Sequence, residues 1–203
     1  MNTEKLISQI NYGATPEEAI AAINLLVVDS TQELTIINTL IQAINHHHPS
    51  VRSAAVKALI KLGSVSVQPL ITAYANSGDQ GLQAYIIQAL AEIAHPEALD
   101  LLVEVVGTNV ANHCQGNVRR IAARGLGRIA CKLNDPTVLH QVQEKLIWAL
   151  TTPEDWGLRY TAAVSLQDIA TPAAQAALQQ AIAKETDQVV CSRVAIALEG
   201  VRE

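Results

Sequence analysis

The sequence predicts an all-α fold, an α-solenoid of about six stacked helix pairs that forms a single domain over residues 1–203. Three observations lead to this prediction. Hydrophobic residues make up 49% of the chain and include no Phe, so the apolar content is mostly Ala, Leu, Ile and Val, which suits thin, closely packed helices. A nine-residue pattern recurs along the chain. The β-branched residues fall on helical rather than alternating positions, so strand signals are absent.

The nine-residue pattern marks one helix of each predicted pair. Each copy has an apolar first residue, small or apolar residues in fifth and sixth place, and Leu in ninth place, which puts a buried stripe on one helix face. The ninth-place leucines lie about 31 to 40 residues apart, a spacing typical of helical repeats. The copies are 51–59 (VRSAAVKAL), 82–90 (LQAYIIQAL), 118–126 (VRRIAARGL), 158–166 (LRYTAAVSL) and 190–198 (VCSRVAIAL), with a weaker sixth copy at 17–25 that ends on Leu25.

A second helix is predicted between successive copies. The prolines fall at or near the expected helix starts and turns, where a missing N–H costs little. Each pair by itself leaves an apolar stripe uncovered, so we expect the pairs to be stable only when stacked. The predicted ranges of these helices are 31–45, 66–77, 97–107, 137–151 and 173–184.

Composition argues against several other classes of protein. A net charge of -5 disfavours a broad nucleic-acid surface, which needs positive charge. The longest nearly apolar run, 19–28, is half of the roughly twenty residues that a membrane span requires, so no span is expected. The chain begins without the features of a signal peptide, and its three cysteines cannot all pair, which favours the cytoplasm. Cys131 and Cys191 are expected to be structural.

One connection between paired helices is longer than the others. Residues 107–117 form a link of about eleven residues, and because stacking does not require such an insertion we predict a functional loop here. Cys114 is expected just before a helix that begins near Val118, with Asn117 as its N-cap. The helix N-terminus would then favour a thiolate at Cys114, beside the imidazole of His113. Alternatively, the two residues are merely exposed loop side chains.

Basic residues gather on the helix that follows this loop. Arg120, Arg124 and Arg128 are spaced by four and therefore share one face of a chain that is otherwise acidic. Such a face can hold carboxylates of a ligand, and it lowers the pKa of a nearby thiol. It can equally form ion pairs between repeats.

Two further groups of residues have alternative interpretations. Residues 46–48 are three adjacent histidines, but they splay apart on a turn and lack complementary ligands, so no metal site is expected. Trp148, Trp156 and Tyr160 gather in the fifth pair. They either pack as core and cap or present a flat surface to a conjugated ligand.

The copies resemble the second helix of a HEAT repeat, which begins with Val-Arg and lies on the inner face, as in Val51-Arg52 and Val118-Arg119. Alanine-rich HEAT-like repeats over this length resemble the phycobilin lyases of cyanobacteria, in particular the F-type subunit of the two-subunit enzymes. Residues 112–117 (NHCQGN) look like the His-Cys motif of the phycoerythrocyanin-type subunit, whose enzyme isomerises the bilin during attachment.

The resemblance implies a bilin lyase-isomerase. Its substrate would be phycocyanobilin, attached to a cysteine of an apo-phycobiliprotein α subunit and converted to phycoviolobilin, with no other cofactor. Its partner would be a homologous E-type subunit in a heterodimer. The final helix, 188–201, fits this because it carries more apolar residues than one neighbour is expected to cover. The alternatives are a non-isomerising subunit of a phycocyanin α-subunit lyase and a non-catalytic HEAT scaffold.

Roles follow for individual residues. Cys114 is predicted as a transient nucleophile and His113 as a proton shuttle. Arg120 and Arg124 are predicted to pair with bilin propionates, which rests on their charge and not on the motif. The remaining predicted bilin-binding residues are Asn112, Gln115, Asn117, Trp156 and Tyr160.

Overall fold

A computed structural model describes residues 3–28, 34–108, 113–133, 135–152 and 154–199. The chain divides into two compact units, Met1–Ile93 and Ala94–Glu203. Every regular element in the described part of the chain is a helix, which confirms the predicted all-α solenoid class. That the whole chain acts as a single domain stays a prediction.

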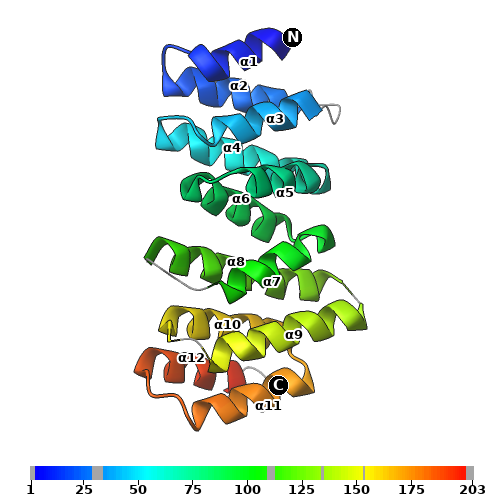
Figure 1. Ribbon diagram of the computed structural model, residues 1–203, viewed down its shortest axis with the longest axis vertical. Coiled ribbons are helices and arrows are strands. Elements are labelled where there is room, and N and C mark those ends of the chain that lie inside the picture. The colour runs from blue at the N-terminus through cyan, green and yellow to red at the C-terminus, as the bar shows by residue number, and fades with distance from the viewer. Residues whose placement is uncertain (1–2, 29–33, 109–112, 134, 153, 200–203) are drawn as a thin grey trace. The chain divides into compact units, whose positions relative to one another are not determined.

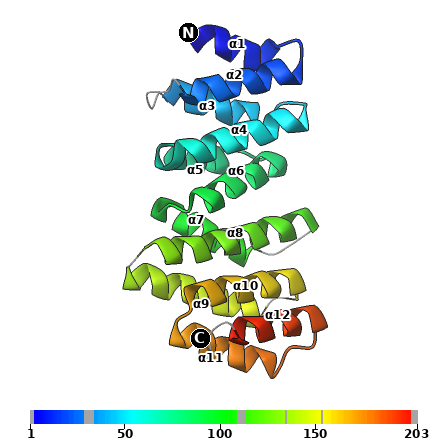
Figure 2. The ribbon, with the colours of Figure 1, turned by 180° about the vertical axis from the view of Figure 1, so that it is seen from behind.

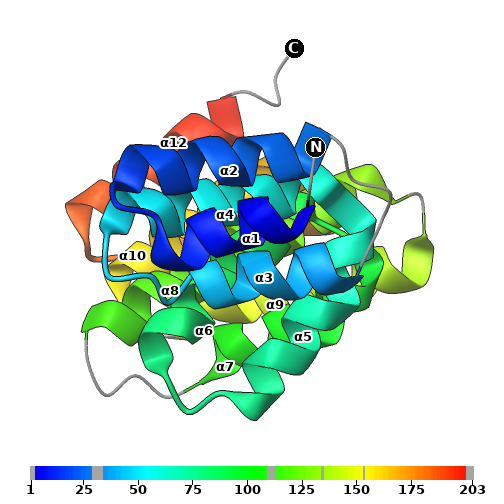
Figure 3. The same ribbon diagram turned by 90° about the horizontal axis from the view of Figure 1, so that it is seen from above.

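The first unit consists of three helix pairs (Figure 1). The second helix of each pair packs on the second helix of the next, so that α2 lies on α4 and α4 on α6, as the view in Figure 3 shows for α2 and α4. Ile23, Leu40 and Leu59 are completely buried between these layers. The helices are α1 (Thr3–Tyr12), α2 (Pro16–Val28), α3 (Leu34–Ala43), α4 (Pro49–Leu62), η1 (Gly63–Ser66), α5 (Val67–Asn76) and α6 (Gln80–Ile93).

The second unit repeats this arrangement (Figure 2). Its central helix is α10, which packs against α8, α9, α11 and α12, while α8 also packs on α7. The amino-terminal ends of α8, α10 and α12 lie at the same edge of this unit. Its helices are η2 (Pro96–Ala98), α7 (Leu99–Gly107), α8 (His113–Lys132), α9 (Pro136–Thr151), α10 (Trp156–Ile169), α11 (Pro172–Ile182) and α12 (Gln188–Glu199).

The predicted repeat frame holds in four of the five clear copies. In the fifth, Leu198 is only half-buried while its neighbour Ala197 is completely buried, and the weak copy is also out of frame. The ninth-place leucines Leu59, Leu90, Leu126 and Leu166 are completely buried. In α2, by contrast, Leu25 is 41% exposed and its neighbour Leu26 is 2% exposed, so the frame 17–25 is wrong by one residue. Two adjacent leucines made the frame ambiguous, and packing against α1 and α4 selects Leu26.

The second position of the nine-residue pattern has a structural role that explains its frequent arginine. In each clear copy this side chain bonds a backbone carbonyl of the turn or helix end that precedes it, where the last carbonyls of a helix lack partners. The bonds are Arg52 Nη1 to His46 O (2.8 Å), Gln83 Nε2 to Ser77 O (2.8 Å), Arg119 Nε to Val106 O (2.9 Å), Arg159 Nη1 to Glu154 O (3.1 Å) and Cys191 Sγ to Glu185 O (3.4 Å).

One helical stretch of the described residues, Pro49–Asn76, is long and apolar enough to cross a membrane by length and composition alone. It is not a single helix, because Gly63 adopts φ 72° and divides it into α4, η1 and α5. Val51, Leu59 and Leu70 in this stretch are completely buried in the core of the first unit. Its apolar character is therefore explained by packing between repeats.

Candidate functional site

The predicted His-Cys motif lies at the start of α8. This helix begins at His113, five residues before the predicted start at Val118, so the backbone of His113 and Cys114 belongs to its first turn. The prediction that Asn117 is the N-cap is wrong, because Asn117 lies in the second turn and is exposed. Asn is a preferred N-cap residue, but an Asn inside a helix is tolerated when its side chain is exposed, as Asn117 is here. Gln115 is half-buried in the first turn.

The predicted loop 107–117 is correspondingly shorter, because α7 ends at Gly107 and α8 begins at His113. Asn112 lies outside the described residues, as do the side chains of His113 and Cys114. A first-turn position places a side chain close to the positive end of the helix dipole. A thiolate at Cys114 stays a prediction.

Arg120 forms a two-point ion pair with Asp155. Its Nη2 lies 2.6 Å from Oδ1 and its Nε donates to Oδ2 at 3.2 Å. Asp155 is also the N-cap of α10 and accepts a hydrogen bond from the amide of Gly157 at 2.9 Å. Gly157 leaves room for this guanidinium, because a Cβ there would lie 2.3 Å from Cζ of Arg120 and would push that side chain aside. One turn of α10 thus holds the guanidinium in place.

Burial by itself raises the pKa of the Asp155 carboxyl. The hydrogen bond and the charge of Arg120, together with the amides of Gly157 and Leu158, outweigh burial and hold that pKa below its usual value of 3.8. The carboxylate is therefore ionised at neutral pH, and the ion pair with Arg120 is complete there.

Aromatic side chains lie beside this ion pair. Cζ of Arg120 is 5.7 Å from the ring centroid of Trp156, a cation–π distance. Trp156 is 47% exposed, and Tyr160, one turn further along α10, is 36% exposed. Of the two interpretations, exposure favours a surface for a ligand over core packing. Their predicted contact with bilin stays a prediction.

Arg124 is also engaged with an acidic residue of α10. Its Nη1 lies 2.8 Å from Oδ2 of Asp168 and 3.3 Å from Oγ of Ser165. Ser165 Oγ in turn donates to the carbonyl of Ala123 at 3.1 Å. Helices α8 and α10 approach closely here, because a Cβ on Gly127 would lie 2.8 Å from Cβ of Ser165. The alternative that the arginine face forms ion pairs between repeats therefore describes both Arg120 and Arg124.

A second basic group, which the sequence analysis did not single out, lies at the carboxyl end of α7. Arg119 is only 7% exposed, and its Nε donates to the carbonyl of Val106. Lys145 of α9 reaches the same helix end, since a Cβ on Gly107 would lie 2.6 Å from its Nζ. Its ammonium is also 4.5 Å from the ring centroid of Trp148. We refer to Arg119 and Lys145 as the α7-end basic pair.

The surroundings of the α7-end basic pair disfavour the positive charge of both side chains. Burial first, and the charge of Arg119 second, lower the pKa of Lys145. Burial lowers the pKa of Arg119 as well, and the charge of Asp155 acts in the opposite direction. Each group would therefore hold its proton more firmly if an anion were close by.

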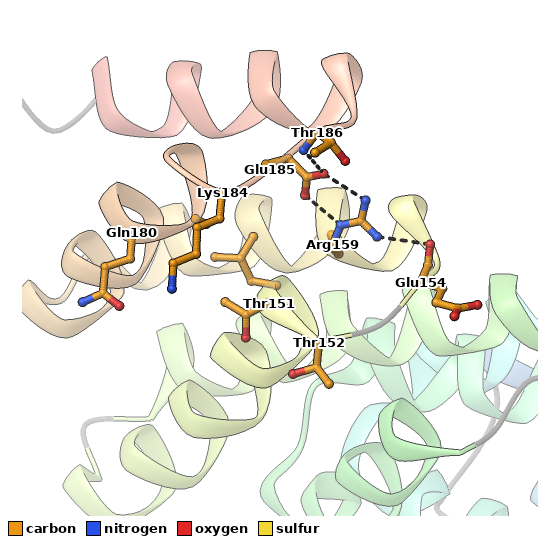
Figure 4. A pocket seen from close by; sticks show the side chains of 10 residues that line it. Thr151, Thr152, Glu154, Arg159, Gln180, Lys184, Glu185 and Thr186 are labelled. Atoms are coloured by element: carbon orange, nitrogen blue, oxygen red, sulfur yellow. Dashed lines mark hydrogen bonds and ion pairs between the residues drawn. The ribbon is translucent and has the colours of Figure 1, made fainter.

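A cleft of about 420 Å³ lies beside this edge, between the carboxyl ends of α9 and α11 and the start of α10 (Figure 4). Arg159 crosses it and binds both carboxylate oxygens of Glu185, at 2.7 and 3.0 Å. Backbone amides of Thr186 and Asp187 also donate to Glu185, at 2.9 Å each. The hydrogen bond between Arg159 and Glu185 raises the pKa of Arg159 and lowers that of Glu185. Arg159 and Glu185, the two charged residues in the middle of this cleft, thus form an ion pair with each other.

The histidine run closes the turn between α3 and α4. The rings of His46 and His47 stack with centroids 4.1 Å apart, and the amide of His48 donates to Nδ1 of His46 at 3.1 Å. Among the residues described, no group of three or more His, Cys, Asp or Glu side chains could hold a metal ion. Cys131 is exposed, so the expectation of a structural cysteine is wrong there, whereas Cys191 is half-buried.

Comparison with known proteins places the chain in a family. The HEAT repeats family matches residues 3–81 and 106–199, and the family described as PBS lyase HEAT-like repeat matches residues 82–108. Together these matches cover most of the chain, and they agree with the helix pairs described above.

Individual relatives are more specific. The chain is 70% identical to the bilin biosynthesis protein PecF of a Nostoc species over 162 residues, which are 80% of this chain and 94% of that protein. It is 54% identical to PecF of Mastigocladus laminosus, over 98% of this chain and 95% of that one. The phycocyanobilin lyase subunit beta of Nostoc is 32% identical over 96% of this chain and 98% of that protein.

A solved structure agrees with these matches. It is the complex of CpcE and CpcF of phycocyanin lyase from Nostoc, in which a chain superposes with a TM-score of 0.70 and 31% identity, over 81% of this chain and 99% of that one. The expected resemblance is confirmed: this chain belongs to the HEAT-repeat phycobilin lyase family, in the group of the PecF bilin biosynthesis proteins.

Proposed function

We propose that this chain is the F-type subunit of a bilin lyase-isomerase. The enzyme attaches phycocyanobilin to a cysteine of a phycobiliprotein α subunit and yields phycoviolobilin. The observation that carries this proposal is the difference in identity between relatives. Two PecF proteins are 70% and 54% identical to the chain, whereas the phycocyanobilin lyase subunit beta is 32% identical. This difference favours the isomerising enzyme over the non-isomerising one.

The chemistry requires no cofactor besides the bilin. A thiol adds across the ethylidene double bond of phycocyanobilin, forming one C–S bond and one C–H bond. Isomerisation removes a proton from one carbon and returns a proton to another, so neither step consumes an oxidant or a reductant. Cys114, in the first turn of α8, serves as the transient thiolate, and His113 moves the protons. Release of Cys114 by the acceptor cysteine regenerates the enzyme.

The edge of the second unit supports bilin binding. Trp156 and Tyr160 present partly exposed aromatic faces on α10, and Arg120 lies against one of them. A conjugated tetrapyrrole can stack on such faces, with its carboxylates near basic side chains. Of the motif residues, Gln115 and Asn117 lie on α8 in the same region, and they complete the proposed bilin site.

We also propose a heterodimer with a homologous E-type subunit in the cytoplasm, where thiols stay reduced. The solved relative is a complex of CpcE with CpcF. On α12 the neighbouring helices cover more apolar surface than the sequence suggested, since Val190 and Val194 are completely buried. Val189 and Ile196, seven residues apart on one face, remain 51% and 53% exposed, and they provide the contact surface for the partner.

Co-expression with a bilin source, an E-type subunit and candidate α chains tests the function. We expect an adduct with the absorption of phycoviolobilin, formed only when both subunits sediment as one complex. Cys114→Ser and His113→Ala should abolish isomerisation and leave the helical circular dichroism unchanged, with Cys191→Ser as the matched control. A phycocyanobilin adduct would indicate the non-isomerising enzyme. An unchanged bilin spectrum, with and without the partner subunit, would indicate a scaffold.

A further inference from the structure

We propose that the α7-end basic pair, Arg119 and Lys145, is the subsite that binds a carboxylate of the bilin. The ligand class is the propionate side chain of an open-chain tetrapyrrole. This proposal rests on the proposed function for the identity of the ligand. It changes the sequence-based prediction, which gave the propionates to Arg120 and Arg124.

The basic side chains at this edge of the second unit differ in whether they already hold a carboxylate. Arg120 binds Asp155, Arg124 binds Asp168 and Arg159 binds Glu185, at 2.6 to 2.8 Å. Arg119 instead donates its Nε to a neutral carbonyl, and Lys145 contacts an aromatic ring. Within the described residues, neither member of the pair forms an ion pair. Arg119 and Lys145 therefore differ from these three arginines in having charges that are available to an incoming carboxylate.

The two cations are fixed against the same helix end. Arg119 is held by the carbonyl of Val106, and the ammonium of Lys145 packs on Gly107, where an added Cβ would displace it. The carboxyl end of α7 carries a partial charge of about -0.5, which is too small to neutralise two full positive charges. The charge of Asp155 also acts on Arg119, but that carboxylate is already paired with Arg120. Like charges brought together in a partly buried site repel each other, and a bound carboxylate removes that repulsion.

The surroundings of the pair fit a tetrapyrrole propionate. The ring of Trp148 lies beside Lys145 and offers a flat apolar face next to the charge. A guanidinium and an ammonium together can bind both oxygens of one carboxylate. Arg119 follows Cys114 by five residues on α8, a rise of about 7.5 Å along the helix axis. Arg119 is therefore about one and a half helical turns from Cys114 along the axis of α8.

Comparison of free and esterified ligand tests the proposal directly. Binding of phycocyanobilin and of its dimethyl ester is measured by the change in absorption, with the chain alone and with its E-type partner. The variants are Lys145→Gln, Lys145→Arg and the matched control Lys184→Gln, whose lysine lines the cleft of Figure 4 on the same unit. We expect Lys145→Gln to weaken binding of the free acid about tenfold and to leave ester binding unchanged.

Lys145→Arg should retain most of the affinity, and Lys184→Gln should alter neither ligand. Circular dichroism confirms that the variants are folded. If Lys145→Gln weakens acid and ester equally, or weakens neither, the subsite is wrong while bilin attachment by the wild type still supports the proposed function. If Arg120→Gln, and not Lys145→Gln, weakens binding of the free acid and leaves ester binding unchanged, the propionate binds Arg120 and not the α7-end basic pair. A wild-type protein that binds no bilin would overturn both proposals.

Discussion

Helices α6 and α10 begin with the same local sequence and the same cap, in different units. Each start reads Asp-X-Gly-Leu, in Asp79 to Leu82 and in Asp155 to Leu158. Asp79 Oδ1 accepts from the amide of Gly81 at 2.7 Å, and Asp155 Oδ1 accepts from the amide of Gly157 at 2.9 Å. The capping hydrogen bond is thus determined by the four residues themselves.

The surroundings of the two starts differ. At α10, Arg120 of the preceding repeat binds the capping carboxylate and lies against Trp156, where α6 has Gln80. At α6, a Cβ on Gly81 would meet only the carboxylate of Asp79, at 3.1 Å. The same local motif therefore acts only as an N-cap in the first unit, whereas in the second unit its capping carboxylate also binds an arginine. Neighbouring repeats, and not the motif, create the difference.

Removing the two capping carboxylates should give the largest contrast. Asp79→Ala should destabilise the chain by about 1 kcal/mol, the usual value for an N-cap. Asp155→Ala should cost about 2 kcal/mol, because the cap and the pairing of Arg120 are lost together, the latter counted modestly since Arg120 is partly exposed. Urea unfolding followed by circular dichroism measures both. Equal losses would show that the Arg120 pair contributes nothing to stability.

Replacing the glycine at each helix start by alanine should give a smaller difference between the two units. In Gly157→Ala the new Cβ displaces the guanidinium of Arg120, so we expect a loss of about 1 kcal/mol, near the upper end for an ion pair. Gly81→Ala should stay within about 0.5 kcal/mol of the wild type.

Tryptophan emission gives a second measurement for the glycine variants. In a Trp148→Phe background Trp156 is the only tryptophan, and its emission should change in Gly157→Ala and not in Gly81→Ala. An unchanged emission in Gly157→Ala would mean that Arg120 keeps its position beside Trp156.

The smallest effect should be a dependence on pH. Because folding lowers the pKa of Asp155, its ionised form contributes stability above the unfolded value of 3.8 and loses it as the pH falls through the folded pKa. The stability difference between wild type and Asp155→Asn should therefore shrink below pH 3.8. Denaturant unfolding between pH 7 and pH 3 measures this difference, with Asp79→Asn as the comparison. A difference that grows on acidification would contradict the role given to Asp155.

Much of the fold could be predicted from the sequence because each repeat carries its own apolar stripe. Leu59, Leu90 and Leu126 occupy the buried places that the nine-residue pattern gave them. The errors occurred where local signals were ambiguous. Leu25 and Leu26 are equally apolar, and only the packing of neighbouring helices distinguishes them. The predicted start of α8 is five residues too late, because Asn117 is a preferred N-cap residue and no local signal shows that the helix already begins at His113.

The site was less predictable because its contacts join different repeats. The shared face of Arg120 and Arg124 follows from their spacing, but Asp155 and Asp168 lie 35 and 44 residues away. Asp155 could have been found as a cap from its place before a helix. Lys145 had no such signal, since it belongs to no motif and meets Arg119 only when α8 and α9 pack around the end of α7.

The bond from Arg119 to the carbonyl of Val106 has a consequence for how the family can vary. It joins residues 13 apart and fixes both ends of the connection between α7 and α8, whatever lies between them. Lengthening a connection with fixed ends costs only about 0.6 kcal/mol for each doubling of its length. New chemistry can therefore be inserted in this one connection without disturbing the repeats above and below it. The two helices of each pair are thus held together independently of the connection between them, so mutation and selection can change the connection without changing the stack.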